Sequence, residues 1–293
     1  MDWKYFMSAE DLEKKLANKP ENFALLDVTR GKGNYPLAET RTERDYEAGH
    51  IPGAQNFSTD ELGEFKAYLK PYPDLVNTFL VHGVGAKTEL VVYSIYAEDI
   101  MYIASRVAWA AYVVGVENVK ILNGGFQAWE RAGFALESGV NVATPKSNFK
   151  GEYPKHPDCH VKTPDDLKAA LEGKPNVKLA CVRSLEEFEG KTQGHAWNAG
   201  AGQIKGAIYM GDDEVLMDEQ GLLADPKTYL EAFEAAGFTK DQRIIVYCGT
   251  SWRASTAFFV LKSLGYPEVA VFDGSWYKWK IAHDAEPEQY PVQ

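Results

Sequence analysis

The sequence has few cysteines and no long hydrophobic run. Its 293 residues contain only Cys159, Cys181 and Cys248, an odd set that allows at most one disulfide. This usage favours a reducing compartment or one special thiol over a disulfide framework. The longest nearly continuous apolar stretch, residues 107–116, is far too short to span a bilayer. Residues 1–4 lack an apolar signal core, so as written the chain is expected to be cytoplasmic, although a periplasmic mature form without its signal peptide would look the same.

Basic residues are also scarce: 31 Lys and Arg stand against 42 Asp and Glu, a net charge of −11. Nucleic acids and anionic membranes require clustered positive charge, so neither is an expected partner. A small anionic substrate remains compatible if a local pocket supplies arginine or backbone N–H groups. The 45% hydrophobic and 25% charged residues are typical of a folded protein. The length corresponds to about two domains, so each half can bury a core of its own.

The chain repeats itself once, at an offset near 154 residues. The matching segments occur in the same order in both halves, so the repeat indicates two duplicated domains. We predict domains at residues 1–140 and 160–293, with residues 141–159, rich in Pro, Lys, Asn and Gly, as the linker. The matched pairs are residues 25–29 with 179–183, 49–54 with 202–207, 91–94 with 245–248, and 123–129 with 273–279.

Short apolar strands alternate with helical patterns in both halves. This alternation predicts an α/β fold in which each domain has a mainly parallel sheet flanked by helices. The final residues, 284–293, resemble a tail. The expected strands are residues 23–28, 90–93, 119–122, 177–182 and 243–247, and the expected helices are 8–16, 101–114, a short one after 124, one from 163, 226–236 and 253–264.

Cys248 lies where a buried strand ends and a helix is about to begin. Ligands of open α/β sheets bind beyond the carboxyl ends of the strands. A loop from Cys248 to Arg253 that curls into the helix would aim backbone N–H groups at the sulfur and stabilise a thiolate and a bound anion. Arg253 adds a permanent positive charge. An inert buried thiol is the alternative, but the spacing to Arg253 and the helix entry count against it.

Three motifs together resemble the tandem-domain rhodaneses, sulfurtransferases of the thiosulfate or 3-mercaptopyruvate type. They are the Cys-led loop at residues 248–253, the Gly-His-Ile-Pro-Gly-Ala turn at 49–54 with a weaker copy at 202–207, and the helix signatures at 124–129 and 274–279. The resemblance covers nearly the whole chain. The loop, together with residues 190–192 and the insertion up to Gly202, is most similar to a bacterial subgroup with Cys-Gly-Thr-Gly-Trp-Arg loops.

This resemblance implies a double displacement without a cofactor. The Cys248 thiolate would take a sulfane sulfur from thiosulfate or 3-mercaptopyruvate, become a persulfide, and pass the sulfur to cyanide or a thiol, with a protein dithiol among the candidate acceptors. Arg183 would lean into the site and hold the donor's anionic end; a surface or inter-loop salt bridge is its alternative role. The expected substrate-binding residues are Arg183, Gly249, Thr250, Ser251, Trp252 and Arg253.

The sequence departs from the family pattern at two positions of this site. Ser251 stands where many family loops have glycine, so we expect a more constrained backbone there. Cys181 replaces the usual aspartate of an Asp-x-Arg strand end, which predicts that Arg183 is freer to bind substrate, while Cys181 itself is a small apolar strand residue. Trp252 is expected to form a wall of the pocket, or else to anchor the loop by packing.

The first half has Ser94 at the cysteine position, and its segment up to Ile103 is four residues longer than the second-half loop. The carboxylates of Glu98 and Asp99 in that segment would repel a thiolate and an oxyanion, so we predict that this domain is non-catalytic. His50 is expected to be a turn or core histidine. Residues 156–160 include metal-capable side chains but lack zinc spacing, which predicts no metal site.

Two other classes of function remain open. Cysteine phosphatases use Cys-x5-Arg, whereas the present spacing is Cys-x4-Arg, one residue shorter and better suited to a single sulfur atom than to phosphate. A non-enzymatic persulfide carrier or interaction module is the second alternative. The donor also stays open, because the Cys-Gly-Thr start of the loop resembles the mercaptopyruvate type and its Trp-Arg ending does not.

Overall fold

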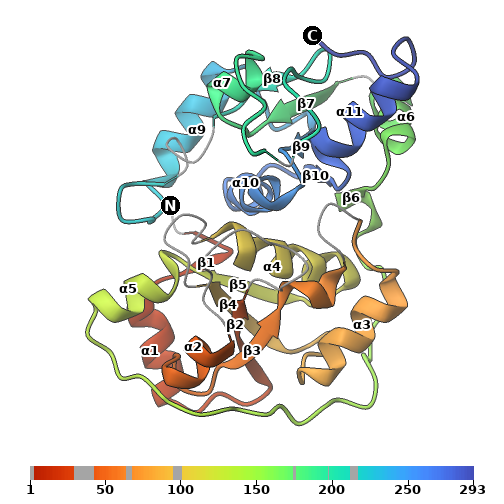
Figure 1. Cartoon of the computed structure of the whole chain (residues 1–293). Helices are drawn as coiled ribbons and strands as arrows, with labels where there is room; N and C mark the ends of the chain where they lie inside the picture. Colours follow the sequence, from red (N-terminus) through yellow and green to blue (C-terminus); the bar gives the residue numbers. More distant parts are fainter. Residues whose placement is uncertain are drawn as a thin grey trace. The chain divides into compact units, whose positions relative to one another are not determined.

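The computed structural model describes residues 3–29, 43–63, 68–94, 101–173, 176–196, 198–211 and 217–293. They form two compact units, one mainly from Lys4–Pro157 and the other mainly from residues 158–293 (Figure 1). Each unit contains one five-stranded sheet in which every pair of neighbouring strands is parallel. The α/β class predicted from the sequence is therefore confirmed.

The two sheets have the same topology, β1-β5-β4-β2-β3 and β6-β10-β9-β7-β8. The central strands are continuous apolar segments, as expected for sheets covered on both faces. The strands of the first domain are β1 (Phe6–Met7), β2 (Phe23–Thr29), β3 (Gln55–Ser58), β4 (Glu89–Ser94) and β5 (Asn118–Leu122). Those of the second are β6 (His160–Val161), β7 (Val177–Cys181), β8 (Ile208–Tyr209), β9 (Arg243–Tyr247) and β10 (Glu268–Phe272).

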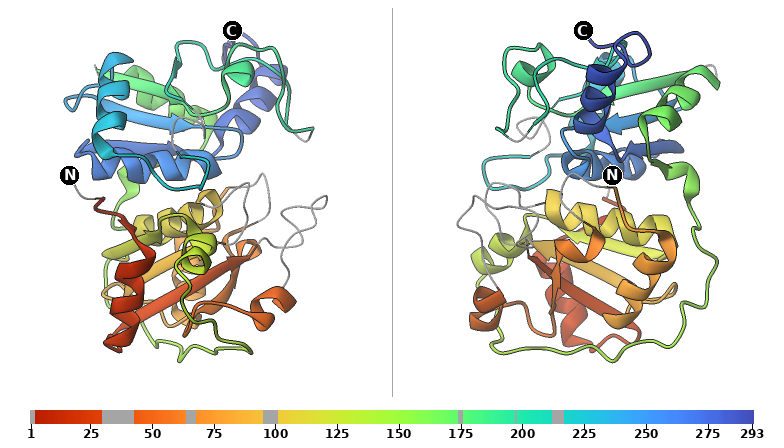
Figure 2. Two further views of the ribbon diagram at one scale, coloured as in Figure 1. Left: turned by 90° about the vertical axis from the view of Figure 1, so that its left-hand side faces the viewer. Right: turned by 45° about the vertical axis from the view of Figure 1, so that its right-hand side comes forward.

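Helices cover both faces of each sheet (Figures 1 and 2). In the first domain α4 packs on one face of the sheet, against β4 and β5, while α1 and α5 pack on the other face. In the second domain α10 packs on one face, against β9 and β10, while α6 and α11 pack on the other face. The first-domain helices are α1 (Ala9–Ala17), α2 (Glu43–Ala48), η1 (Thr59–Leu62), α3 (Tyr72–Val81), α4 (Tyr102–Val114) and α5 (Gly125–Arg131). The second domain has η2 (Pro157–Cys159), α6 (Pro164–Gly173), α7 (Leu185–Phe188), α9 (Pro226–Ala235), α10 (Trp252–Ser263) and α11 (Ser275–Ala285).

Helix ends follow local signals in the sequence. Ser8 Oγ accepts a hydrogen bond from the Asp11 N–H and starts α1. Thr163 and Asp166 exchange side-chain-to-backbone hydrogen bonds before α6 in a capping box. Gly265 follows α10 with a φ of +86°, the left-handed conformation that ends a helix.

The last ten residues are packed rather than forming the free tail that the sequence suggested. Tyr290 is only 7% exposed and donates a 2.6 Å hydrogen bond to Asp165 Oδ1. Val292 forms a β-bridge with Ile204, and Gln293 exchanges backbone hydrogen bonds with Gln203. Aromatic packing and backbone pairing therefore make this segment part of the second domain. Within the described parts of the chain, no helix is long and apolar enough to cross a membrane.

Candidate active site

Cys248 directly follows β9, and its backbone is tied to the start of α11. The Cys248 N–H donates to Ser275 Oγ at 3.2 Å, and the Cys248 carbonyl accepts from the Trp276 N–H at 2.9 Å. The Gly249 carbonyl accepts from the Tyr277 N–H at 3.0 Å. Cys248 itself is 2% exposed. The strand end and the first loop residue are therefore held in place by a helix 27 residues further along the chain.

Ser251 precedes α10 in the left-handed conformation, with φ +70° and ψ 0°. This confirms the constrained backbone expected where a non-glycine residue replaces glycine. Ser251 is fully buried, and its Oγ donates to Asp273 Oδ1 at 3.3 Å. Asp273 Oδ2 lies 3.0 Å from His160 Nε2. Hydrogen-bonded polar side chains from the start of β6 (His160) and the end of β10 (Asp273) thus support the turn at Ser251 that leads into α10.

Helix α10 begins at Trp252, one residue earlier than predicted, so Trp252 and Arg253 belong to its first turn. The first N–H groups of a helix have no partner within the helix and point towards its N-terminal end. The carboxyl end of β9, the loop and the start of this twelve-residue helix therefore lie together around Cys248. Helix N-termini at the carboxyl end of a sheet are common anion-binding positions, which makes the Cys248 loop the candidate active site.

Arg253 is already paired with a carboxylate. Its Nη1 and Nη2 atoms lie 2.8 and 3.2 Å from the two carboxylate oxygens of Glu187, in α7. Burial would raise the pKa of Glu187, but hydrogen bonds from Arg253 and from the Ser184 N–H outweigh burial and lower that pKa. Glu187 is therefore ionised at neutral pH, and it compensates the permanent positive charge that Arg253 was expected to add.

Arg183 follows the end of β7 and is fully buried. Its Nε lies 3.4 Å from Cys181 Sγ, and its Nη2 donates to the Gly202 carbonyl at 2.7 Å. The guanidinium also lies over Trp276, 4.8 Å from the ring centroid. Burial would lower the pKa of Arg183, but interactions with Cys181 and Tyr247 outweigh burial and raise it.

These contacts correct two expectations about Arg183. Replacement of the family's aspartate does not leave the guanidinium free, because Cys181 and the Gly202 carbonyl take the place of that partner. A surface salt bridge is excluded by its complete burial. One nitrogen, Nη1, is buried without a hydrogen-bond partner. Cys181 itself is a buried strand residue, as expected.

The insertion at residues 190–202 packs around this part of the site, with residue 197 outside the described structure. Gly194 has a φ of +74°, and a Cβ there would lie 2.6 Å from Glu187 Oε1. The Gly200 carbonyl accepts a 2.7 Å hydrogen bond from Trp276 Nε1. The insertion therefore closes over Glu187 and Trp276, which contact the two arginines.

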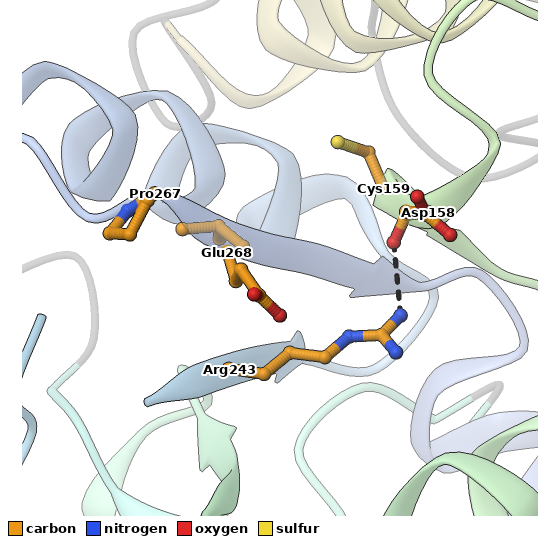
Figure 3. A pocket seen from close by; sticks show the side chains of 6 residues that line it. Asp158, Cys159, Arg243, Pro267 and Glu268 are labelled. Carbon is orange, nitrogen blue, oxygen red and sulfur yellow. Dashed lines mark hydrogen bonds between the residues drawn. The ribbon is translucent and has the colours of Figure 1, made fainter. Parts of the chain in front are cut away.

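Cys159 directly precedes the edge strand β6 and lies beside a cavity of about 240 Å³ (Figure 3). Arg243 and Glu268, the first residues of β9 and β10, line this cavity, and Arg243 Nη2 donates to the Asp158 carbonyl at 3.0 Å. Burial raises the pKa of Cys159 to about 11. Its thiol is protonated at neutral pH and is a poor nucleophile.

In the first domain Ser94 is the last residue of β4 and is fully buried. Helix α4 begins at Tyr102; Glu98 and Asp99 lie outside the described residues, so their predicted repulsion stays a prediction. His50 is fully buried and stacked on Tyr46, which confirms a core histidine.

The metal-capable side chains of residues 156–160 do not converge on one point. His156 stacks on Tyr112, whereas His160 pairs with Asp273. Among the described residues, no group of three or more His, Cys, Asp and Glu side chains is placed to hold a metal ion.

Both domains match the family model of the rhodanese-like domain, over residues 8–132 and 163–282. The chain therefore belongs to the rhodanese-like domain family and carries two such domains in tandem. This confirms the family resemblance found in the sequence. The family match does not confirm the finer assignment to the Cys-Gly-Thr-Gly-Trp-Arg subgroup, which rests on the loop and the insertion up to Gly202.

Several similar proteins are named sulfurtransferases. The chain is 31% identical over 249 residues to thiosulfate sulfurtransferase YnjE of Escherichia coli K12, covering 80% of this chain and 54%, about half, of that relative. It is 29% identical over 252 residues to the 3-mercaptopyruvate sulfurtransferase of the same organism, covering 84% and 85% of the two chains. A solved structure of an EanB cysteine persulfide with ergothioneine aligns with TM-score 0.87 and 25% identity over 99% of this chain and 70% of that one. These likenesses support a transferase of the rhodanese type.

Proposed function

We propose that this chain is a sulfurtransferase in which Cys248 carries the transferred sulfur as a persulfide. The observation that supports the proposal most directly is the position of Cys248 between the carboxyl end of β9 and the first turn of α10. The EanB structure holds a persulfide on a cysteine of a similar fold. The protonated thiol of Cys159 and the complete burial of Cys181 make the other two cysteines poorer candidates.

The first half-reaction transfers one sulfur atom to the enzyme. The Cys248 thiolate attacks the sulfane sulfur of thiosulfate, the donor S–S bond breaks, and sulfite leaves with the bonding electron pair. With 3-mercaptopyruvate the C–S bond breaks instead, and the pyruvate enolate that leaves takes up a proton. In the second half-reaction cyanide or a thiolate attacks the outer sulfur, and the Cys248 thiolate is regenerated. A protein dithiol is a further candidate acceptor.

The donor's anionic end is held, in this proposal, by the loop residues Gly249–Arg253 and by Arg183. Backbone N–H groups of the loop and the first helical turn supply hydrogen bonds. Arg183 contributes Nη1, its one nitrogen without a hydrogen-bond partner in the protein. Trp252, half-buried in the same turn, limits the size of the donor.

The test is to incubate the protein with thiosulfate or 3-mercaptopyruvate and to map the added sulfur by mass spectrometry. We expect one additional sulfur on the Cys248 peptide and catalytic production of thiocyanate from cyanide. Cys248→Ser should abolish both, whereas Cys159→Ser, far from the site, should retain them. Sulfur on Cys181 or Cys159 with an active Cys248→Ser variant would overturn the assignment.

Two further measurements separate the alternative functions. A single stoichiometric sulfur on Cys248 without turnover of small donors identifies a persulfide carrier. Rapid Cys248-dependent hydrolysis of an aryl phosphate identifies a phosphatase, which the short Cys-x4-Arg spacing opposes.

A further inference from the structure

One buried carboxylate serves both arginines of the candidate site. Glu187 forms the two-pronged ion pair with Arg253 and also interacts electrostatically with Arg183, which lies four residues earlier in the chain. The Glu187 side chain is 4% exposed and that of Arg253 is 15% exposed. Solvent therefore screens these charges poorly, and Glu187 removes one of the two positive charges that an incoming anion would meet.

Three local features hold Glu187 in this position. It closes a capping box with Ser184, whose N–H donates to Glu187 Oε2 at 3.0 Å and whose Oγ accepts from the Glu187 N–H at 3.2 Å. The contact with Gly194 leaves no room for a side chain beside its carboxylate. Arg253 occupies both carboxylate oxygens. The carboxylate is thus a fixed charge at the end of the sheet where β7 and β9 point.

From this geometry we infer that Glu187 determines which donor charge the site accepts, by compensating Arg253 and so reducing the attraction for dianions. This inference names the donor class of the proposed sulfurtransferase and rests on that function. A dianion such as thiosulfate gains twice as much as a monoanion from each uncompensated positive charge at the same distance. With Glu187 in place the site favours monoanionic donors, of which 3-mercaptopyruvate is an example.

Glu187→Gln tests this inference because the amide keeps the shape and an acceptor for the Ser184 N–H while removing the charge. The readout is the ratio of kcat/KM for thiosulfate to kcat/KM for 3-mercaptopyruvate, measured on the same preparation. Loss of active protein cancels in this ratio. We expect the ratio to rise by about three- to tenfold, an order of magnitude set by one charge at low screening. Glu186→Gln, which removes an exposed charge from the neighbouring residue, should leave the ratio unchanged.

A second readout does not depend on sulfur transfer. The rate at which anionic iodoacetate alkylates Cys248 is divided by the rate for neutral iodoacetamide. This ratio should rise in Glu187→Gln, fall in Arg253→Gln, where Glu187 loses its ion-pair partner, and return towards the wild-type value when both substitutions are combined. The combined variant keeps the net charge of the pair, so it also tests the inference if Glu187→Gln alone folds poorly.

The outcomes separate this inference from the proposed function. If no donor places sulfur on Cys248 but the alkylation ratios shift as expected, the proposed function fails and the electrostatic role of Glu187 stands. If sulfur transfer is confirmed but neither ratio changes in Glu187→Gln, Glu187 is a structural residue and the inference is overturned. Equal shifts in Glu186→Gln would also overturn it, because they would reflect the general negative field of the protein.

Discussion

The two domains share one topology, but the connection from the carboxyl end of the central strand to the next helix differs in length between them. In the first domain β4 ends at Ser94, and α4 does not begin until Tyr102. In the second domain β9 ends one residue before Cys248, and α10 begins at Trp252. The short connection brings a thiol directly to the start of a helix. The comparison teaches that the candidate chemistry depends on loop length as much as on the presence of cysteine.

A buried tyrosine near each strand end shows a second difference. In the first domain Tyr93 donates a 2.8 Å hydrogen bond to Asp27 and accepts one from the Ile51 N–H. In the second domain Tyr247 pairs in register with Cys181, and the Arg183 guanidinium lies 5.7 Å from its ring centroid. Burial and the neighbouring Cys181 raise the pKa of Tyr247. A cluster of Cys181, Arg183 and Tyr247 thus takes the place of a tyrosine–carboxylate pair.

The largest expected effect comes from moving the nucleophile from the second domain to the equivalent position in the first. In a Cys248→Ser background, Ser94→Cys should not restore sulfur transfer, because α4 begins only at Tyr102, whereas α10 begins at Trp252, directly after the Cys248 loop. Activity should stay at least about a thousandfold below wild type, the usual scale for loss of a nucleophile. The measurement is thiocyanate formation together with mass spectrometry of the introduced thiol.

Ser94→Cys in the wild-type background is the control and should leave the activity unchanged. Sulfur accumulating on the introduced thiol with turnover would show that the first domain already contains a competent site and that only its side chain differs.

In the sequence repeat, the position of Arg183 is occupied by Thr29 in the first domain. Charge-assisted hydrogen bonds contribute about 1.5–3 kcal/mol, so Arg183→Met should lower kcat/KM for the donor by about ten- to a hundredfold. The first half-reaction should suffer more than the second with a neutral thiol acceptor. Rapid-mixing measurements of the two half-reactions check this. Equal losses in both would indicate a purely structural residue.

Cys181→Ala is the matched control, because it removes the contact with Arg183 Nε and leaves Nη1 in place. Its effect on the donor half-reaction should be much smaller. Arg183→Ala is less informative: the side chain is completely buried, so its removal leaves a cavity and should lower the melting temperature.

The sequence predicts the α/β class and the parallel sheets well because the repeat, the apolar strands and the helix caps are local signals. The strand order and the strands β1, β3, β6, β8 and β10 required the structure. The candidate site at Cys248 was predicted from its place between a strand and a helix and from the family resemblance. The pairing of Glu187 with Arg253 was missed because it joins residues 66 positions apart, although the Ser184-x-x-Glu187 capping pattern was visible. The burial of Arg183 depends on Trp276 and Gly202, which no local pattern near Arg183 indicates. Residues 284–293 carry no periodic signal, so their packing also required the structure.

The smallest expected effect concerns the residue that opens the last helix of each domain. Gly125 and Ser275 both adopt positive φ, +56° and +46°, at the start of α5 and α11. Only the serine has a side chain, and its Oγ accepts from the Cys248 N–H and donates to the Phe272 carbonyl at 2.9 Å. The strain of a left-handed non-glycine residue therefore accompanies two hydrogen bonds at the candidate site.

Two substitutions separate strain from hydrogen bonding at Ser275. Ser275→Ala keeps the strained backbone and loses both hydrogen bonds, so we expect a free energy of unfolding lower by about 1–3 kcal/mol. Ser275→Gly loses the same bonds but relieves the strain, which should recover about 1 kcal/mol of that loss. Denaturant unfolding checks this order. Gly125→Ala adds strain without touching Cys248 and should leave sulfur transfer unchanged. If Ser275→Gly were less stable than Ser275→Ala, the left-handed backbone would not be strained, and the two domains would differ here only in hydrogen bonding.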